Sequence, residues 1–133
     1  MLYSRLKYLL TSFFIVLLID STIAQLSTKH YIPPIVVAQQ TAAQEQYIYL
    51  STPRTENVAY TITYIGSNFT ESGTVSNNSP VEIPIKNPNT GVVDFDSNSQ
   101  LVLSGNLGLT NVVLEDRGFI IESQDVIYAS VRV

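Results

Sequence analysis

Hydrophobic and polar residues alternate with a period of two through most of the chain after residue 45. In the clearest run, VAYTITYI at 58–65, one face carries Val58, Tyr60, Ile62 and Tyr64, while the opposite face is mostly threonine. Alternation that is rich in β-branched and aromatic residues is typical of an antiparallel strand with one buried face. This run therefore predicts a half-buried strand.

Three further runs show the same period. QYIYLS at 46–51 sends two tyrosines to one face and an isoleucine and a leucine to the other. FTESGTVS at 69–76 and VEIPI at 81–85 also alternate. Because Pro84 has no N–H to donate to a ladder, the last of these runs is expected at the edge of a sheet.

The last third of the chain contains two regions of strand-like sequence. The region 92–113 is interrupted by Gly105 and Gly108, which predicts two short strands with a bend between them. The runs RGFIIES at 117–123 and DVIYASVRV at 125–133 are joined by the polar residues SQD. Two alternating runs around such a short polar connection predict a β-hairpin.

These runs predict an all-β protein with an antiparallel, β-sandwich-like domain, or a fragment of a larger all-β array. The domain is expected to span residues 46–133. An extended entry segment at 25–45 should precede it, because Pro33 and Pro34 favour extended backbone. The last run ends on Val-Arg-Val without a polar tail, so we expect the domain to be truncated at its C-terminus and to belong to a longer polypeptide.

The first 24 residues have the three-part layout of a secretory signal peptide. Basic residues come first, an apolar run at 9–19 follows, and Asp20 then interrupts the run. The small residues Thr22 and Ala24 suit the −3 and −1 subsites of a signal peptidase, so cleavage is expected between Ala24 and Gln25.

The apolar run of the leader is shorter than the roughly 20 residues that a membrane-spanning helix needs. We therefore expect no membrane span after removal of the signal peptide. The leader predicts a secreted or cell-surface protein.

The composition excludes several kinds of function. The chain carries 7 Lys and Arg against 11 Asp and Glu, a net charge of −4. An acidic excess without a basic cluster argues against a nucleic-acid partner. There is no cysteine, which excludes thiol catalysis and cysteine-based metal sites and favours a bacterial envelope or secreted protein over a disulfide-stabilised exported domain.

The best metal candidate is weak. Asp94, Asp96 and Asn98 place oxygen side chains at alternate positions, as calcium would require. An EF-hand loop beginning at Asp94 would need glycine and glutamate where Ser99 and Gly105 stand. The alternative is a solvated polar loop, and we predict no metal and no cofactor.

The residues that could support catalysis are few. His30 is the single histidine, and it lies in the Pro-flanked entry segment without an obvious partner. The carboxylates of Glu115 with Asp116 and of Glu122 with Asp125 flank polar turns, where acids are common. We therefore predict no catalytic residues and no enzymatic activity.

The tyrosines offer the best candidate for a binding surface. Tyr60 and Tyr64 share one face of the predicted strand at 58–65. If that face is exposed, the two rings could stack on a sugar or anchor a protein partner. The alternative is that they are core residues in cross-strand packing.

Five segments carry a resemblance to known families: AQLSTKHYIPP, EQYIYLSTP, VAYTITYIG, SGTVSNNSPVEIPI and RGFIIESQDVIYASVRV. They resemble the opening of large secreted proteins of Bacteroidetes that typically end in a gliding-motility-associated, type IX secretion sorting domain. The order of features is also distantly similar to the N-terminal region of the IgGFc-binding protein family. The resemblance covers nearly the whole chain after the leader and implies an N-terminal β region used in adhesion or ligand binding. No sorting domain is present in these residues, so type IX export is not inferred.

The leading hypothesis is thus a non-enzymatic, secreted or cell-surface β module that binds a protein or glycan ligand. One alternative is a structural spacer whose edge strands pair with neighbouring modules. Another is an accessory domain of an enzyme whose catalytic part lies downstream.

Overall fold

The computed structural model describes residues 26–37, 45–96, 98–105, 107–109 and 112–133. The expected signal peptide and its cleavage site between Ala24 and Gln25 lie outside the described residues. In the part of the chain that the structure describes, no helix has the length and apolar character needed to span a bilayer.

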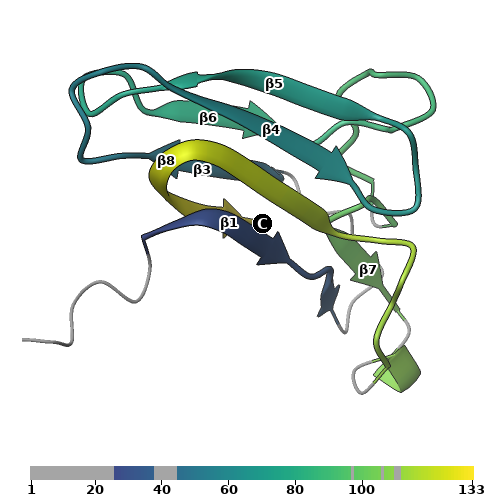
Figure 1. Cartoon of the computed structure of the whole chain (residues 1–133). Coiled ribbons are helices and arrows are strands. Elements are labelled where there is room, and N and C mark those ends of the chain that lie inside the picture. Colours follow the sequence, from purple (N-terminus) through teal and green to yellow (C-terminus); the bar gives the residue numbers. More distant parts are fainter. Residues whose placement is uncertain (1–25, 38–44, 97, 106, 110–111) are drawn as a thin grey trace, which may run out of the picture.

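The described residues form an all-β fold, which confirms the predicted class (Figure 1). Its elements are β1 (Ser27–Ile32), β2 (Ile35–Val37), β3 (Tyr47–Ser51), β4 (Val58–Tyr64), β5 (Thr70–Val75), β6 (Val81–Pro84), β7 (Val102–Ser104), the 3₁₀ turn η1 (Leu107–Leu109) and β8 (Phe119–Arg132). Six strands form one sheet in the order β5-β4-β8-β3-β6, with β1 also paired to β8. All pairings in this sheet are antiparallel, and the sheet curls into a β-sandwich-like domain.

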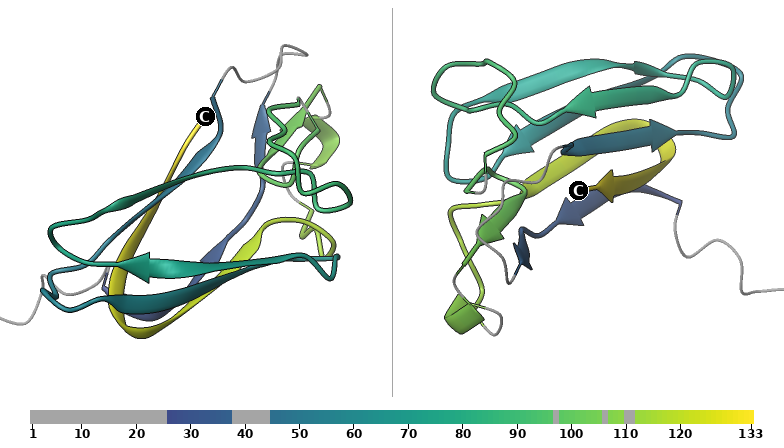
Figure 2. Two further views of the ribbon diagram at one scale, coloured as in Figure 1. Left: turned by 90° about the horizontal axis from the view of Figure 1, so that it is seen from above. Right: turned by 180° about the vertical axis from the view of Figure 1, so that it is seen from behind.

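The long strand β8 organises the sheet. Its first half, Phe119 to Ser123, lies between β4 and β1, and its second half, Tyr128 to Arg132, pairs with β3. Figure 2 shows how β8 turns from one side of the curled sheet to the other. The predicted hairpin at 117–133 is therefore wrong: both runs belong to one 14-residue strand, because each pairs with strands from earlier in the chain instead of with the other run.

Local bonds lie at the centre of β8, where the strand turns back from one layer of the curled sheet to the other (Figure 2). The pairs Lys29↔Glu122 and Ser27↔Ile127 are two positions apart on β1 but five apart on β8, so β8 carries extra residues in a β-bulge. Within this bulge, Asp125 accepts a hydrogen bond of 2.7 Å from the backbone N–H of Val126. The same carboxylate lies 2.9 Å from Nε of Arg54, an ion pair that links the bulge to the loop after β3.

We expect Asp125 to make the stability of the fold sensitive to acid. The N–H of Val126 and then the Arg54 guanidinium lower the pKa of Asp125, because both stabilise its carboxylate. The resulting stability is present above the unfolded-state pKa of about 3.9 and is lost as the pH falls through the lower folded-state value. In urea unfolding at a series of pH values, the stability advantage of wild type over Asp125→Asn should begin to fall near pH 4 and disappear at lower pH.

The matched control for this acid effect is Glu56→Gln, which changes an exposed acid in the loop that carries Arg54. This variant should keep the wild-type pH dependence. An advantage of wild type over Asp125→Asn that stayed constant down to about pH 2 would contradict the assignment.

The predicted alternation identifies the buried face of three strands. In β3 and β4 every second side chain is buried, and these are the apolar and aromatic positions expected from the sequence. In β6, Ile83 is buried and the strand lies at the sheet edge, as Pro84 predicted. The core contains these buried side chains: Ile48, Leu50, Val58, Tyr60, Ile62, Tyr64, Val75, Ile83, Ile85, Leu101, Val102, Phe119, Ile121 and Ile127.

Tyr64 joins the apolar core to a buried polar contact. Its ring meets Phe69 and Phe119 edge-on, with centroid distances of 4.9 and 4.8 Å. Its hydroxyl donates to Glu71 Oε1 at 2.6 Å and accepts from the backbone N–H of Lys86 at 3.3 Å. Glu71 also forms an ion pair with Lys86. One side chain therefore ties together β4, β5, β8 and the residues after β6.

The entry segment contains more regular structure than the sequence suggested, and the region 92–113 contains less. The entry segment contributes β1, paired to β8, and β2, paired in parallel to β7. Prolines 33 and 34 separate these strands without preventing either from pairing. In the region 92–113, by contrast, β7 is the only named strand among the described residues, so the expectation of two strands is wrong. An isolated bridge between Lys86 and Val93 takes the place of the other strand.

Candidate functional site

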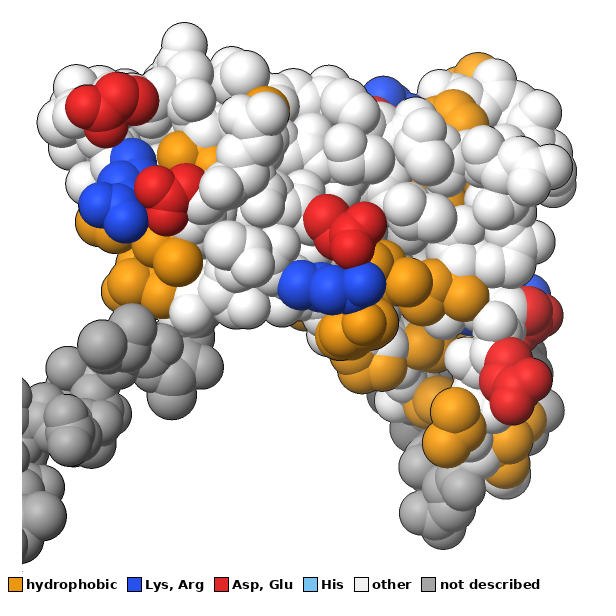
Figure 3. Space-filling view, viewed as in Figure 1, with side chains coloured by type: hydrophobic (Ala, Val, Ile, Leu, Met, Phe, Trp, Pro, Cys, Tyr) orange, Lys and Arg blue, Asp and Glu red, His pale blue; other side chains and the backbone are white. Residues whose placement is uncertain are grey.

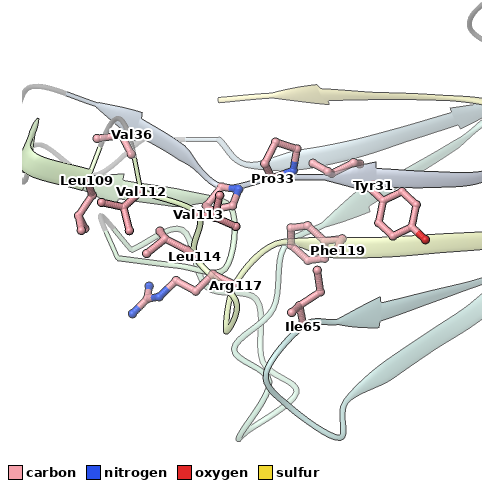
Figure 4. A pocket seen from close by; sticks show the side chains of 12 residues that line it. Tyr31, Pro33, Val36, Ile65, Leu109, Val112, Val113, Leu114, Arg117 and Phe119 are labelled. Atoms are coloured by element: carbon pink, nitrogen blue, oxygen red, sulfur yellow. The ribbon is translucent and has the colours of Figure 1, made fainter.

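An apolar groove of about 480 Å³ lies at one end of the fold, between the end of β1 and the segment 112–117. Figure 4 shows its lining side chains. One end of the groove is formed by Val36, Leu109 and Val112. The other end is formed by Tyr31, Ile65 and Phe119. The groove therefore joins residues that are far apart in the sequence.

Several apolar side chains around this groove are unusually exposed. Val113 is 86% exposed, Tyr31 is 66% exposed and Val112 is 51% exposed. Hydrophobic side chains gather at the lower right of Figure 3, over the region of β7 and η1 in the same view. We call Tyr31, Val112 and Val113 the exposed rim of the groove.

The backbone on both sides of the groove is held in place by close contacts. The prolines at 33 and 34 end β1 and direct the chain into β2. Gly118 has a φ of 99° and lies so close to β1 that an added Cβ would be 2.5 Å from the carbonyl oxygen of Ile32. Because Gly118 has no side chain, the segment 112–117 can turn directly against the end of β1.

A polar pocket of about 250 Å³ adjoins the groove, and Arg117 lines both. The pocket contains two basic and two acidic side chains: Lys86, Arg117, Asp94 and Asp116. Arg117 donates from one terminal nitrogen to the carbonyl oxygens of Asn98 and Ser99, each at 3.0 Å. The guanidinium is therefore held by the protein itself at the border between groove and pocket.

A buried amide positions the loop that supplies these carbonyl groups. Gln46 is completely buried, and its Nε2 donates to the carbonyl oxygen of Asp96 at 2.8 Å. Its Oε1 accepts a hydrogen bond from the hydroxyl of Ser99. The Ser99 oxygen in turn accepts from the backbone N–H groups of Leu101 and Val102. The pocket wall is thus anchored to the start of β3.

The weak metal candidate is divided between the pocket and the neighbouring loop. Asp94 and Asn98 line the polar pocket, whereas Asp96 does not. The Asp94 carboxylate accepts from the side-chain amide of Asn87 at 3.2 Å and from the backbone N–H of Asp96 at 3.0 Å. Among the residues that the structure describes, no group of three or more His, Cys, Asp or Glu is placed to hold a metal ion. These bonds match the polar-loop alternative.

Tyr60 and Tyr64 are buried, with 8% and 0% of their surfaces exposed. They face the core because β4 packs that side against the rest of the curled sheet. The packing alternative therefore describes both residues, and neither forms an exposed binding face. The outer surface of β3, β6 and β8 instead presents Tyr49 and Tyr128, which line a shallow depression.

Three of the residues considered for catalysis form other contacts. His30 lies on β1, and its Nε2 is 3.0 Å from the carbonyl oxygen of Ile127, so it is fixed and partly buried instead of lying in a loose terminal segment. Glu122 forms an ion pair with Lys29 at 2.9 Å. Asp125 forms the ion pair with Arg54 described above.

The sequence analysis did not find the groove. Its rim comes from β1 and from Val112 and Val113, which stand outside any alternating run. The available signal was three consecutive apolar residues, Val112 to Leu114, followed by Glu115 and Asp116. Adjacent apolar residues beside acids suit neither a core strand nor a solvated turn.

Comparison with known proteins adds no relative. No protein-family model, no curated protein and no solved structure matches the chain. The functional inferences below therefore depend on the sequence and on the geometry of the site.

Proposed function

We propose that this protein is a non-enzymatic, secreted or cell-surface β module that acts in adhesion, and that its groove binds an apolar, extended segment of a partner protein. The observation that carries this proposal is the exposed rim of Tyr31, Val112 and Val113 around a concave surface. Soluble proteins seldom leave a contiguous apolar surface uncovered unless it takes part in binding. The location outside the cell depends on the expected leader and on the resemblance to secreted Bacteroidetes proteins.

The chemistry of the groove favours a protein segment over a glycan. Sugar sites combine an exposed aromatic face with several hydrogen-bonding groups, whereas aliphatic and proline side chains dominate this lining. Phe119 is buried, so Tyr31 alone offers an exposed ring. Among the described lining residues Arg117 is the only charged one, and it already donates to two carbonyl groups. An uncharged apolar ligand fits these conditions best.

The contacts of Glu122, Asp125 and His30 support a role without catalysis. A glycosidase needs one carboxyl group to transfer a proton and a second that is free to act as base or nucleophile. Glu122 and Asp125 each form an ion pair with a basic residue instead. The imidazole of His30 lies against the backbone carbonyl groups of Ser27 and Ile127.

The proposal predicts that Val113→Asp weakens binding without unfolding the protein. Val113 is 86% exposed, so the change in folding free energy should stay within about 0.5 kcal/mol. Binding should weaken by at least about tenfold, because a buried and unpaired carboxylate would face an apolar ligand. The measurement is binding to an array of uncharged ten-residue peptides with alternating valine or leucine, beside an array of glycans.

The matched control is Val92→Asp, which introduces the same charge at a valine that is 65% exposed and outside the groove. It should bind the peptides like wild type. Preferential binding to glycans, or equal binding by wild type and Val113→Asp, would overturn the proposal. A protein that bound neither array would instead support the spacer alternative.

A further inference from the structure

The second half of β8 has one open edge. Residues 128–132 pair with β3 on one side. On the other side, the ladder with β1 reaches Ser27↔Ile127, its last pair in this direction. Among the described residues no strand continues along 128–132, so this stretch is an unpaired sheet edge.

The hydrogen bonds of neighbouring strands show which backbone groups point to this edge. The N–H of Ile85 donates to the carbonyl of Gln46 at 3.0 Å, so Gln46 directs its backbone toward β6. Backbone groups of successive strand residues point to opposite sides, so Tyr47, Tyr49 and Ser51 direct theirs toward β8. These three lie opposite Arg132, Ser130 and Tyr128.

It follows that Ala129 and Val131 direct their N–H and C=O groups to the open edge. Two other contacts agree with this assignment. Ile127 is two residues before Ala129, so its backbone groups point to the same side of the strand. Its carbonyl oxygen lies 3.0 Å from Nε2 of His30 on the β1 side. The backbone groups of the adjacent Val126 point to the opposite side, and its carbonyl oxygen accepts a hydrogen bond from the hydroxyl of Thr52 at 2.7 Å on the β3 side.

From this geometry we infer that residues 128–132 of β8 form a self-association site, at which two copies of the chain pair as antiparallel edge strands around a twofold axis at Ser130. In this register Ala129 of one copy lies opposite Val131 of the other, and both direct backbone hydrogen bonds across the interface. The pairing is isologous, so one patch serves both copies.

The side chains are self-complementary in the same register. On the outer face Tyr128 lies opposite Arg132 of the second copy, which places a guanidinium beside an aromatic ring on both sides of the axis. Both side chains are exposed, and Arg132 also forms an ion pair with Glu45 of its own chain at 2.8 Å. No like charges lie directly opposite each other. On the inner face, Ala129 and Val131 already pack against the core of their own copy. In the dimer they would lie opposite Val131 and Ala129 of the second copy.

A second copy is favoured over a different partner strand because the edge is complementary to itself in antiparallel pairing: tyrosine meets arginine on the outer face, and apolar residues meet apolar residues on the inner face. The interface is small, and we expect a dissociation constant of about 10–100 μM. Sedimentation equilibrium of the purified protein across this concentration range should show a reversible dimer. None of residues 128–132 lines the groove, so Val113→Asp should dimerise like wild type.

The register is tested with Ser130→Cys, because the chain contains no other cysteine. Ser130 would face itself in a non-hydrogen-bonded pair, with a Cα separation of about 4.5 Å that lies within the range for a disulfide. Mild oxidation should give a covalent dimer at least about tenfold faster than for Ser72→Cys, a matched change at an exposed serine on the edge strand β5.

Equal cross-linking of the two cysteine variants would overturn this register. A monomer throughout the concentration range would overturn self-association, including the case in which a strand of another protein occupies the edge. Loss of peptide binding together with an intact dimer would contradict only the proposed function, so the two proposals fail separately.

Discussion

Replacement of Tyr64 by alanine is expected to remove a large part of the stability of this fold. The side chain is completely buried, and its ring packs edge-on against Phe69 and Phe119. Truncation of a buried aromatic residue costs about 3–5 kcal/mol, which is a large part of the 5–15 kcal/mol that stabilises a typical domain. The measurement is urea unfolding followed by far-ultraviolet circular dichroism, since the chain contains no tryptophan.

Tyr64→Phe separates the role of the hydroxyl from that of the ring. The change removes the hydrogen bond to Glu71 and the acceptor for the N–H of Lys86, at a cost of about 1–3 kcal/mol. Tyr31→Ala is the control, because Tyr31 is 66% exposed and its loss should change the free energy of unfolding by less than about 1 kcal/mol. Equal losses for Tyr64→Ala and Tyr31→Ala would contradict the core assignment.

The second large effect is expected at Gly118, where alanine should destabilise the fold by about 2–5 kcal/mol. Two causes add together at this position. The φ of 99° is unfavourable for a residue with a side chain, and the new Cβ would lie 2.5 Å from the carbonyl oxygen of Ile32. The backbone of β1 or of the segment 112–117 must therefore move, and the groove should deform with it.

Gly91→Ala isolates the steric contribution. Gly91 has a φ of 70°, but an added Cβ there would meet only Phe69, at 3.6 Å or more. This variant should lose only the conformational part, about 1–2 kcal/mol. If both variants lost the same stability in urea unfolding, close contact between Gly118 and β1 would not be the cause.

The sequence predicted the local strands well because each buried face is encoded by adjacent alternating residues. The alternation in β3 and β4 was sufficient to separate the two faces of each strand, and Pro84 was sufficient to place β6 at an edge. Strands whose pairing depends on distant partners were harder. The polar strand β1 has no clear alternation, so its place beside β8 could not be predicted from its own residues.

The errors at β8 and at the candidate site have related causes. The residues SQD do mark a turn of the chain, but the run before them pairs with β1 and β4 and the run after them pairs with β3, so the two runs do not form a hairpin. The alternation of β4 could not show whether its aromatic face is covered, and that face proved to be the core. The groove combines segments from β1 to the start of β8, so only the tertiary structure brings its rim together.

The position of β8 in the chain has a consequence for folding kinetics. Its partner strands β1, β3 and β4 all precede it, and the contact between His30 and Ile127 joins residues 97 positions apart. A sheet closed by such distant contacts folds slowly, because long loops must be ordered before the contacts form. During synthesis the earlier strands therefore remain without their central partner until β8 is made, and the chain should acquire its native sheet in a single late step.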